Sequence, residues 1–444
     1  MRIHFIAIGG SAMHNLALAL HDQGHHITGS DDEIYEPSRS RLAKAGLLPT
    51  QYGWYTEKIE PSIDAIILGM HARVDNPELI KAQELGLRIY SYPEFVAEQS
   101  KDKLRVVIAG SHGKTTTTSI VLNALSSQGI DYDYLVGAQL EGFDRMVRLS
   151  DAKIIVLEGD EYLSSPIDRR PKMMHYNPDI AVITGVAWDH INVFPTLDSY
   201  VDQFEQFIQD MDQRAQLFYY QKDQHLQTII SKDTHGCQAT GYTQIEVDEN
   251  KNYHLGESLY PIQLIGNHNL QNIKSAEFVC LQLGLTVDQF YKSLESFTGA
   301  AKRLQTLKAG VGDAGHIYLD FAHAPSKLTA TTNAVKDWYP AQKLIAVFEL
   351  HTYSSLNAEF LPQYKDALKS ADKAMVLFSE HALKMKRMPM LDPEFVKECF
   401  GEGDIRVFTD KDDLRQAIIA DLDDSSNLLL MSSGTFDGMD VDFS

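Results

Sequence analysis

A glycine-rich stretch in the first third of the sequence is suited to binding phosphate. The run IAGSHGKTTTTS, residues 108–119, follows an apolar segment and precedes a helical pattern, the context that a phosphate-binding loop requires. Ile108 stands where the general pattern has its first glycine, so we predict a shorter loop in which Gly110 makes the turn. Lys114 would contact the β- and γ-phosphates of a nucleotide, and Thr115 would offer its hydroxyl to magnesium. The residues expected to bind ATP here are Gly110, Ser111, His112, Gly113, Lys114, Thr115 and Thr116.

Acidic and histidine side chains follow two apolar segments that come next in the chain. LEGDEY places Glu158, Asp160 and Glu161 at the end of a buried-strand pattern, and carboxylate oxygens are ligands that suit magnesium. WDHINVF places Asp189 and His190 after another such segment. Sheets of α/β proteins assemble their sites at the carboxyl edge. A phosphate loop followed by these two strand ends therefore predicts a two-metal site for phosphoryl transfer.

Three later motifs carry weaker signals. In GNHNLQN, residues 266–272, the polar side chains have turn and helix spacing, although helix capping by Asn269 also explains part of the pattern. AKRLQ offers Arg303 as a phosphate clamp, and YLDFAHAP places Asp320 at a strand end, where carboxylates often bind ribose hydroxyls. The further ATP-binding candidates are His268, Asn269, Asn272, Arg303, Asp320 and His323.

The elements that would position these residues predict an α/β protein with three domains, each built on a mainly parallel sheet. Their expected bounds are residues 1–103, 104–298 and 299–444, since each range alternates short apolar runs with helical patterns. A helical pattern over 268–285 would close the second domain. The predicted strands lie in residues 3–8, in a segment that ends at Gly29-Ser30-Asp31, and in residues 64–70, 87–92, 104–110, 154–160, 180–186, 316–323, 343–350, 373–378 and 427–434.

Composition excludes several classes of protein. The formal net charge of −21 opposes binding to nucleic acid or to acidic membranes, so any phosphate site must be locally positive. No apolar run is long enough to cross a bilayer, and the N-terminal segment lacks the basic region and cleavage site of a signal peptide, so we expect a cytoplasmic protein. The three cysteines are far apart, which argues against a disulfide framework or a structural zinc site.

Taken together, the motifs resemble those of the Mur ligases of bacterial cell-wall synthesis. GSHGKTTTT, EGDEY, WDH, GNHNLQN, KRLQ and DFAHAP occur in the order and spacing of that family, and the resemblance covers essentially the whole chain. It implies a Rossmann-like N-terminal domain that binds a UDP-sugar, a central P-loop domain that binds ATP, and a Rossmann-like C-terminal domain. This last domain would close over ATP and bind the amine substrate.

The resemblance also implies roles for matching positions, with ATP and Mg²⁺ as cofactors. Lys114, His190 and Arg303 would be catalytic, and Thr115, Glu158 and His190 would hold magnesium. Asn272, with His268 nearby, would lie at the adenine. The N-terminal loop and helix start would receive the UDP diphosphate, as helix N-termini bind anions. The UDP-sugar-binding residues implied are Gly9, Gly10, Ser11, Ala12, Met13 and Asp31.

The histidine of GSHGKTTTT resembles the branch of the family that accepts UDP-N-acetylmuramate. Within it, EGDEYLSSPIDRRPKMMHYNPD and MSSGTFDGM resemble enzymes that attach the recycled tripeptide L-alanyl-γ-D-glutamyl-meso-diaminopimelate. His351 instead resembles the L-alanine-adding enzymes, although Thr352 replaces their arginine. Two other departures are Gly185, where the family has asparagine, and Ala7 and Ala12, which replace glycines.

Two rivals come from other classes. An NAD-dependent oxidoreductase is disfavoured, because AIGGSA lacks the spaced glycines of a dinucleotide-binding turn and Asp31 alone is a weak ribose signal. A nucleotide-binding protein without ligase activity stays open on account of Gly185. Phosphate release that depends on both UDP-sugar and amine would exclude that alternative.

Overall fold

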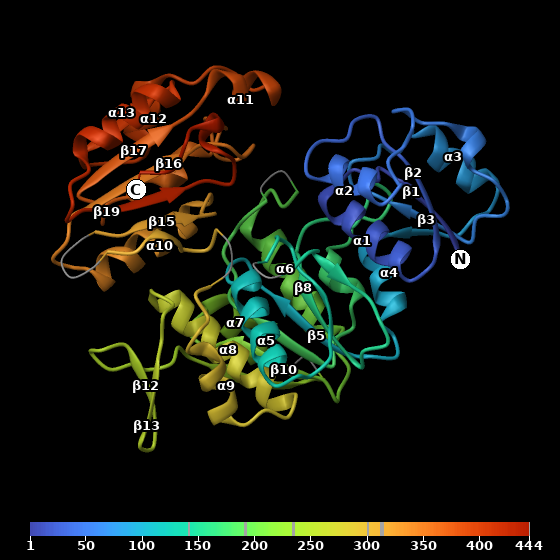
Figure 1. Cartoon of the computed structure of the whole chain (residues 1–444), viewed down its shortest axis with the longest axis horizontal. Coiled ribbons are helices and arrows are strands. Elements are labelled where there is room, and N and C mark those ends of the chain that lie inside the picture. The colour runs from blue at the N-terminus through green and yellow to red at the C-terminus, as the bar shows by residue number, and fades with distance from the viewer. Residues whose placement is uncertain (141–142, 191–192, 233–235, 300–301, 311–314, 444) are drawn as a thin grey trace. The chain divides into compact units, whose positions relative to one another are not determined.

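The computed structural model describes residues 1–140, 143–190, 193–232, 236–299, 302–310 and 315–443 (Figure 1). Contacts between Cα atoms divide the chain into two units, and each is described by itself below. The first unit contains residues 1–188, 193–243 and 275–290, and the second contains 244–274 and 291–443 together with 189–190. Among the described helices, none is both long and apolar enough to span a bilayer.

The first unit begins with a parallel four-stranded sheet in the order β2-β1-β3-β4. Its strands are short and most of their residues are buried, including the whole of β3, as expected for a sheet covered on both faces. Two helices start with side-chain caps: the Asn76 side chain accepts from backbone N–H groups of α3, and Ser91 and Glu94 form a capping box on α4. The elements are β1 (Arg2–Ile6), α1 (Ser11–Asp22), β2 (His26–Ser30), α2 (Ser38–Lys44), β3 (Ala65–Leu68), α3 (Pro77–Glu84), β4 (Ile89–Ser91) and α4 (Tyr92–Gln99).

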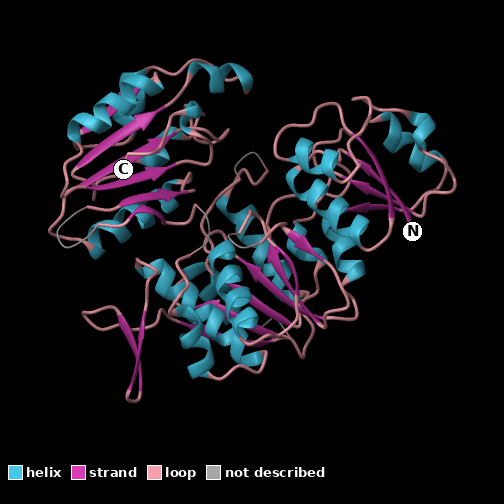
Figure 2. Cartoon of the chain, viewed as in Figure 1, coloured by secondary structure: helices cyan, strands magenta, loops and turns pink. Residues whose placement is uncertain are grey.

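The same unit contains a seven-stranded sheet in the order β11-β10-β9-β5-β8-β6-β7. Helices lie beside its strands (Figure 2). All its neighbouring strands are parallel except β6 and β7. The strands are β5 (Leu104–Ala109), β6 (Asp133–Leu135), β7 (Val147–Arg148), β8 (Ile154–Gly159), β9 (Ile180–Ile183), β10 (Gln216–Tyr220) and β11 (Gln238–Tyr242). The helices are α5 (Lys114–Ser127), α6 (Leu197–Gln209) and α7 (Gln224–Ser231).

The register of this sheet aligns the ends of its three central strands. Ala109 pairs with Gly159 on one side and with Ile183 on the other. Because parallel strands all end at one edge, the chain leaves β5, β8 and β9 at neighbouring points. The glycine loop, the acidic segment and the segment leading to residue 188 therefore start side by side.

The second unit contains a six-stranded sheet in the order β14-β15-β19-β16-β17-β18, parallel except for the edge strand β14. An antiparallel hairpin, β12 (Asn252–Leu255) and β13 (Ser258–Pro261), precedes it. The strands are β14 (Gln305–Lys308), β15 (Ile317–Asp320), β16 (Leu344–Glu349), β17 (Lys373–Leu377), β18 (Ile405–Phe408) and β19 (Asn427–Met431). The helices are α8 (Asn267–Gln282), α9 (Val287–Leu294), α10 (Pro325–Trp338), α11 (Glu380–Met385), α12 (Pro393–Cys399) and α13 (Lys411–Asp421); the contact division passes through α8 and α9.

The mainly parallel α/β architecture predicted from the sequence is confirmed, and each predicted strand range overlaps a strand. The hairpin of β12 and β13 and the strands β6, β7, β10, β11, β14 and β18 lie outside the predicted ranges. Most of these strands are shorter, more exposed or less uniformly apolar than the central strands, so their pattern is weaker.

In the seven-stranded sheet, a buried ion pair joins the residue before β5 to the first residue of β6. Lys103 Nζ lies 2.8 Å from Asp133 Oδ2 and donates to the carbonyls of Ser150 and Ala152 at 2.7 Å each. Asp133 is fully buried and also accepts from the N–H and hydroxyl of Ser150. Every polar group of the pair is satisfied, so removing one partner would leave an uncompensated buried charge.

We expect Asp133→Ala to lower the free energy of unfolding by about 3 kcal/mol, because Lys103 would remain buried without its carboxylate. Asp131→Ala is the matched control, since Asp131 pairs with Arg148 at 2.7 Å but both side chains are exposed. That control should cost less than about 1 kcal/mol. Urea unfolding measures both, and equal losses would contradict the argument.

Candidate active site

The glycine loop adopts a backbone that only glycine accepts easily. Gly110 and Gly113 have φ angles of 119° and 82°. A Cβ at Gly110 would lie 2.3 Å from Thr184 Oγ1, so the close approach of β9's end also excludes a side chain. The loop ends where α5 begins, at Lys114, and no acidic residue lies in the first turn of that helix. This leaves the positive end of the helix dipole available for an anion.

Lys114 is held against the acidic segment that follows β8. Its Nζ lies 2.7 Å from Glu161 Oε2 and donates to the Gly110 carbonyl at 2.5 Å. Burial by itself lowers the pKa of Lys114, but the carboxylates of Glu161, Asp160 and Glu158 outweigh it and raise the pKa. Lys114 is therefore a fixed positive charge in a protein whose net charge is strongly negative.

A buried tyrosine, which sequence reasoning missed, connects Glu161 to the glycine loop. Tyr200 on α6 donates to Glu161 Oε1 at 3.0 Å, and its oxygen lies 2.8 Å from Ser111 Oγ. Ser111 Oγ in turn accepts the N–H of Ala187 at 2.8 Å. Nothing in the pattern of α6 distinguishes Tyr200 from an ordinary core aromatic, and only the fold brings it to the loop.

Thr115 and Glu158 offer oxygen atoms that suit magnesium. Thr115 Oγ1 donates to Glu158 Oε2 at 3.1 Å, and both residues are buried at the carboxyl edge of the sheet. The donor set of one hydroxyl and one carboxylate fits the preference of Mg²⁺ for hard oxygen ligands. Gly137, just after β6, lies so close that a Cβ there would be 2.8 Å from Glu158 Oε2. The predicted metal roles of these two residues stay predictions.

Gly185, the departure from the family pattern, has a φ of 145° that disfavours any other residue. Its carbonyl accepts the N–H of Ser111 at 2.9 Å. Asp223, which sequence reasoning also missed, accepts the N–H of Val186 at 2.7 Å and caps the start of α7. The carboxylate of Asp223 therefore reaches the residues after β9, and it comes from the start of α7.

In the second unit, the start of α8 and the end of β15 carry the candidates for adenine and ribose. Asp320 accepts the N–H groups of Leu304 and Ala322 at 2.7 Å each, which shapes the loop around Arg303. Burial lowers the pKa of His268 while nearby Asp320 opposes that shift, so the two groups lie close together. Asn269 donates to the Ile265 carbonyl at 2.9 Å, as a turn-forming side chain does.

Asn272 and the charged groups of the same unit complete the candidates for ATP binding. Asn272 Nδ2 donates to Asn269 Oδ1 at 3.2 Å. The Arg303 guanidinium lies over the Phe321 ring, 4.7 Å from its centroid. Burial, with help from Lys327, lowers the pKa of His323 to about 3, so this imidazole is neutral at pH 7.

Asp189 and His190 also belong to the second unit. Burial alone would raise the pKa of Asp189, but Lys327 and the neighbouring histidines outweigh it and hold the pKa well below its usual range. Lys327 Nζ lies 3.3 Å from Asp189 Oδ2. His190 has a φ of 56° and donates its N–H to Asp189 Oδ1 at 2.7 Å. The metal role predicted for His190 stays a prediction.

At the N-terminal loop, the carboxylate of Asp31 holds the turn that precedes α1. Asp31 Oδ2 accepts the N–H of Gly9 at 2.6 Å, and a Cβ at Gly9 would lie 2.8 Å from that oxygen. Ala7 takes a positive φ of 68°, so alanine fills a left-handed position there. The structure thus brings Gly9, Gly10, Ser11 and Asp31 together around the start of α1, with Ala12 and Met13 in its first turn.

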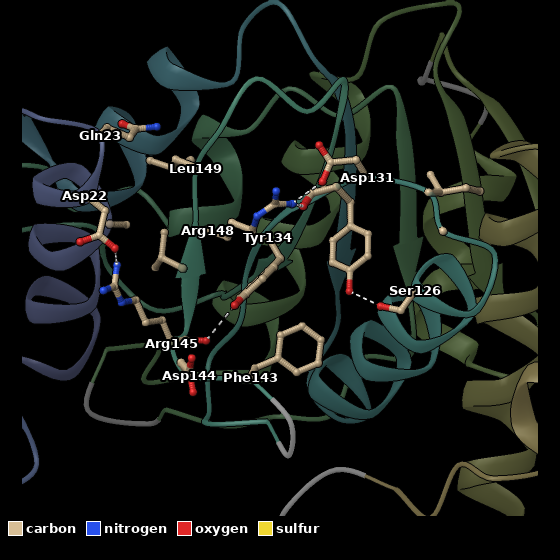
Figure 3. A pocket seen from close by; sticks show the side chains of 15 residues that line it. Asp22, Gln23, Ser126, Asp131, Tyr134, Phe143, Asp144, Arg145, Arg148 and Leu149 are labelled. Atoms are coloured by element: carbon tan, nitrogen blue, oxygen red, sulfur yellow. Dashed lines mark hydrogen bonds and ion pairs between the residues drawn. The ribbon is translucent and has the colours of Figure 1, made fainter.

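A cavity of about 860 Å³ in the first unit has none of the candidate residues in its lining (Figure 3). It is lined by the C-terminal end of α1, the end of α5 and the residues around β6 and β7. Because the residues before β6 lie at the amino edge of the sheet, the cavity is at the opposite edge from the glycine loop. Its arginines, Arg145 and Arg148, already pair with Asp22 and Asp131.

Comparison with known families gives three consecutive matches. A model of the Mur ligase family catalytic domain matches residues 2–103, the Mur ligase middle domain matches 108–280, and the Mur ligase glutamate ligase domain matches 302–434. These matches cover most of the described sheets. The chain belongs to the Mur ligase family. Members of this family are ATP-dependent, ADP-forming amide ligases, and the chain is an enzyme of this class.

Individual relatives differ in their amine substrates. The UDP-N-acetylmuramate–L-alanine ligase of Lactobacillus delbrueckii subsp. bulgaricus is 32% identical over 388 residues, 84% of each chain. The UDP-N-acetylmuramate–L-alanyl-γ-D-glutamyl-meso-2,6-diaminoheptandioate ligase of Haemophilus influenzae is 25% identical over 454 residues, 98% of this chain and 97% of the relative. The solved murein peptide ligase of Psychrobacter arcticus has a TM-score of 0.69 at 22% identity, covering 99% of this chain and 97% of its own, and shows the fold.

Asp31 should make stability depend on pH. Burial raises its pKa to about 6, and Asp32 adds to this, while the Gly9 N–H opposes it. A carboxyl group with a raised folded pKa stabilises fully below its unfolded value of about 3.9, and that contribution is lost as pH rises through 6. We expect Asp31→Asn to be more stable than the parent at pH 7, by up to about 3 kcal/mol, and equal to it near pH 4. A pH-independent difference in urea unfolding would contradict this.

Tyr200→Phe removes the hydroxyl that joins Glu161 to Ser111. We expect kcat/KM for ATP to fall about tenfold, because one buried hydrogen bond that orients the partner of Lys114 is lost. Steady-state phosphate release measures the change. Tyr219→Phe, at a half-buried position on β10, is the control and should leave kcat/KM unchanged. Equal kcat/KM values for the two variants would contradict a role of Tyr200 in the reaction.

Proposed function

We propose that the chain joins UDP-N-acetylmuramate to the tripeptide L-alanyl-γ-D-glutamyl-meso-diaminopimelate, in the recycling of peptidoglycan. The observation that carries this is the extent of the alignment with the H. influenzae ligase, which is named for this tripeptide. It spans 98% of the chain, whereas the alignment with the L. delbrueckii L-alanine ligase spans 84%. The resemblance of residues 158–179 to the tripeptide-adding branch supports the same choice.

In the proposed reaction, the lactyl carboxylate of UDP-N-acetylmuramate attacks the γ-phosphorus of ATP, forming an acyl phosphate and releasing ADP. The amine of the tripeptide then attacks the acyl carbon, an amide bond forms, and inorganic phosphate leaves. The enzyme's main contribution is to position the reactants and to neutralise charge on the transferring phosphoryl group.

Named residues would supply that charge neutralisation. Lys114 would contact the β- and γ-phosphates, with the amides of the glycine loop around them, and Arg303 would add a second cation. Thr115 and Glu158, with His190, would hold Mg²⁺, which neutralises phosphate charge when bound. His268, Asn272 and Asp320 would contact the nucleoside, and the turn at Gly9 and Asp31 would receive the UDP diphosphate.

A second candidate keeps this chemistry and uses L-alanine as the amine. The higher identity to the L. delbrueckii ligase, 32% against 25%, favours it, as does His351 after β16. His351 Nδ1 lies 3.8 Å from Glu349 Oε1, so the end of β16 carries polar groups whichever amine is the substrate.

Phosphate release from ATP, with magnesium and UDP-N-acetylmuramate, separates the candidates when L-alanine and the tripeptide are supplied in parallel. We expect the tripeptide to stimulate release at least tenfold over L-alanine, which corresponds to about 1.4 kcal/mol of discrimination. Omitting UDP-N-acetylmuramate is the control and should abolish the stimulation. Stimulation by L-alanine alone would overturn the proposal in favour of the second candidate, and no stimulation by either would overturn both.

A further inference from the structure

Asn15, on the second turn of α1, links the loop expected to bind the UDP diphosphate to the seven-stranded sheet. Its side chain is fully buried. Asn15 Oδ1 accepts the N–H of Met146, next to β7, at 3.0 Å. Asn15 Nδ2 donates to the carbonyl of Ser11, at the start of α1, at 2.8 Å. One amide group therefore joins the first sheet's nucleotide-sugar loop to the second sheet's edge.

The orientation of this amide is determined by its partners. Met146 contributes an N–H and Ser11 contributes a carbonyl, so the oxygen must face Met146 and the nitrogen must face Ser11. The same nitrogen lies 3.1 Å from His14 Nε2, which must then be the acceptor. His14 Nδ1 consequently carries the proton and donates to the Gly10 carbonyl at 3.0 Å. Burial lowers the pKa of His14, which agrees with this neutral form.

Arg145 and Met146 contact α1 near both of its ends. Ser11 Oγ at the start of α1 lies 3.4 Å from Met146 Sδ, and Asn15 follows one turn later. At the other end of the helix Arg145 pairs with Asp22, as the dashed line in Figure 3 marks. Two consecutive residues just before β7 therefore hold α1, and with it the turn at Gly9 and Gly10, against the seven-stranded sheet.

The segment that ends at Met146 starts beside the candidate metal site. Gly137 lies at its beginning, where a Cβ would be 2.8 Å from Glu158 Oε2. Between these points Gln139 Oε1 accepts from Arg41 of α2 at 3.1 Å, a second contact with the first sheet's helices. The described residues just after β6 thus lie against Glu158, and those just before β7 lie against the start of α1.

We propose that Asn15 is a positioning residue for the nucleotide-sugar substrate: through Met146 it sets the diphosphate-binding turn of α1 at a fixed place relative to Glu158 and the glycine loop. The inference rests on the proposed function, in which that turn receives UDP-N-acetylmuramate. Asn15 itself touches no reacting atom. A displaced turn would weaken nucleotide-sugar binding and misplace the lactyl carboxylate, whereas ATP binding by the glycine loop would stay intact.

The test compares Asn15→Ala with Asn76→Ala in the full-length protein. Asn76 is also a buried asparagine of the first sheet, but it caps α3, so its loss lowers stability without touching α1. We expect Asn15→Ala to raise KM for UDP-N-acetylmuramate about tenfold and to change KM for ATP less than about twofold. Asn76→Ala should change neither, although both variants lower the midpoint of thermal unfolding.

A second measurement needs no substrate. Hydrogen exchange at the Met146 amide should accelerate in Asn15→Ala and stay at the parental rate in Asn76→Ala, because only Asn15 accepts that N–H. If the parent protein does not bind UDP-N-acetylmuramate, the proposed function fails while this exchange result still reports on the link. Unchanged exchange in Asn15→Ala, or a KM for UDP-N-acetylmuramate equal to that of Asn76→Ala, would overturn the inference.

Discussion

The common end point of β5, β8 and β9 is the constraint on which the candidate site depends. Their parallel register puts the residues after Ala109, Gly159 and Ile183 side by side. Lys114 and Glu161 are 47 positions apart in the sequence, yet this register brings them to 2.7 Å. A one-residue slip of β8 would turn Glu158 to the other face and move the acidic segment away.

The buried Lys114–Glu161 pair shows how a strongly acidic protein keeps a buried positive charge beside the glycine loop. A lone lysine at this depth would lose much of its charge to desolvation, and the neighbouring carboxylates prevent that. The hydrogen bonds of Tyr200 and Ser111 then hold Glu161 in place. Such fixed groups reorganise little when a charged ligand arrives, which is the physical basis of preorganised electrostatics.

Gly185 and Asp223 lie close together although they are far apart in the sequence. The backbone at Gly185 occupies a region that asparagine enters only with strain. Asp223, at the start of α7, accepts the N–H of the next residue, Val186. The departure at Gly185 is visible in the sequence, whereas the contact with Asp223 is not, because 38 positions separate the two residues and the whole of β10 lies between them in the chain.

The α/β class, the central strands, the glycine loop and the acidic strand end are predictable from the sequence, because each depends on local patterns: apolar runs, glycine at positive φ, and charges just beyond a strand. Only the folded structure shows which carboxylate pairs with Lys114, that Tyr200 donates to this carboxylate, and that Asn15 joins α1 to Met146. These depend on strand order and on contacts between residues far apart in the chain. A buried tyrosine or asparagine has the same local pattern whether it fills a core or orients a site, so only its neighbours in space reveal its role.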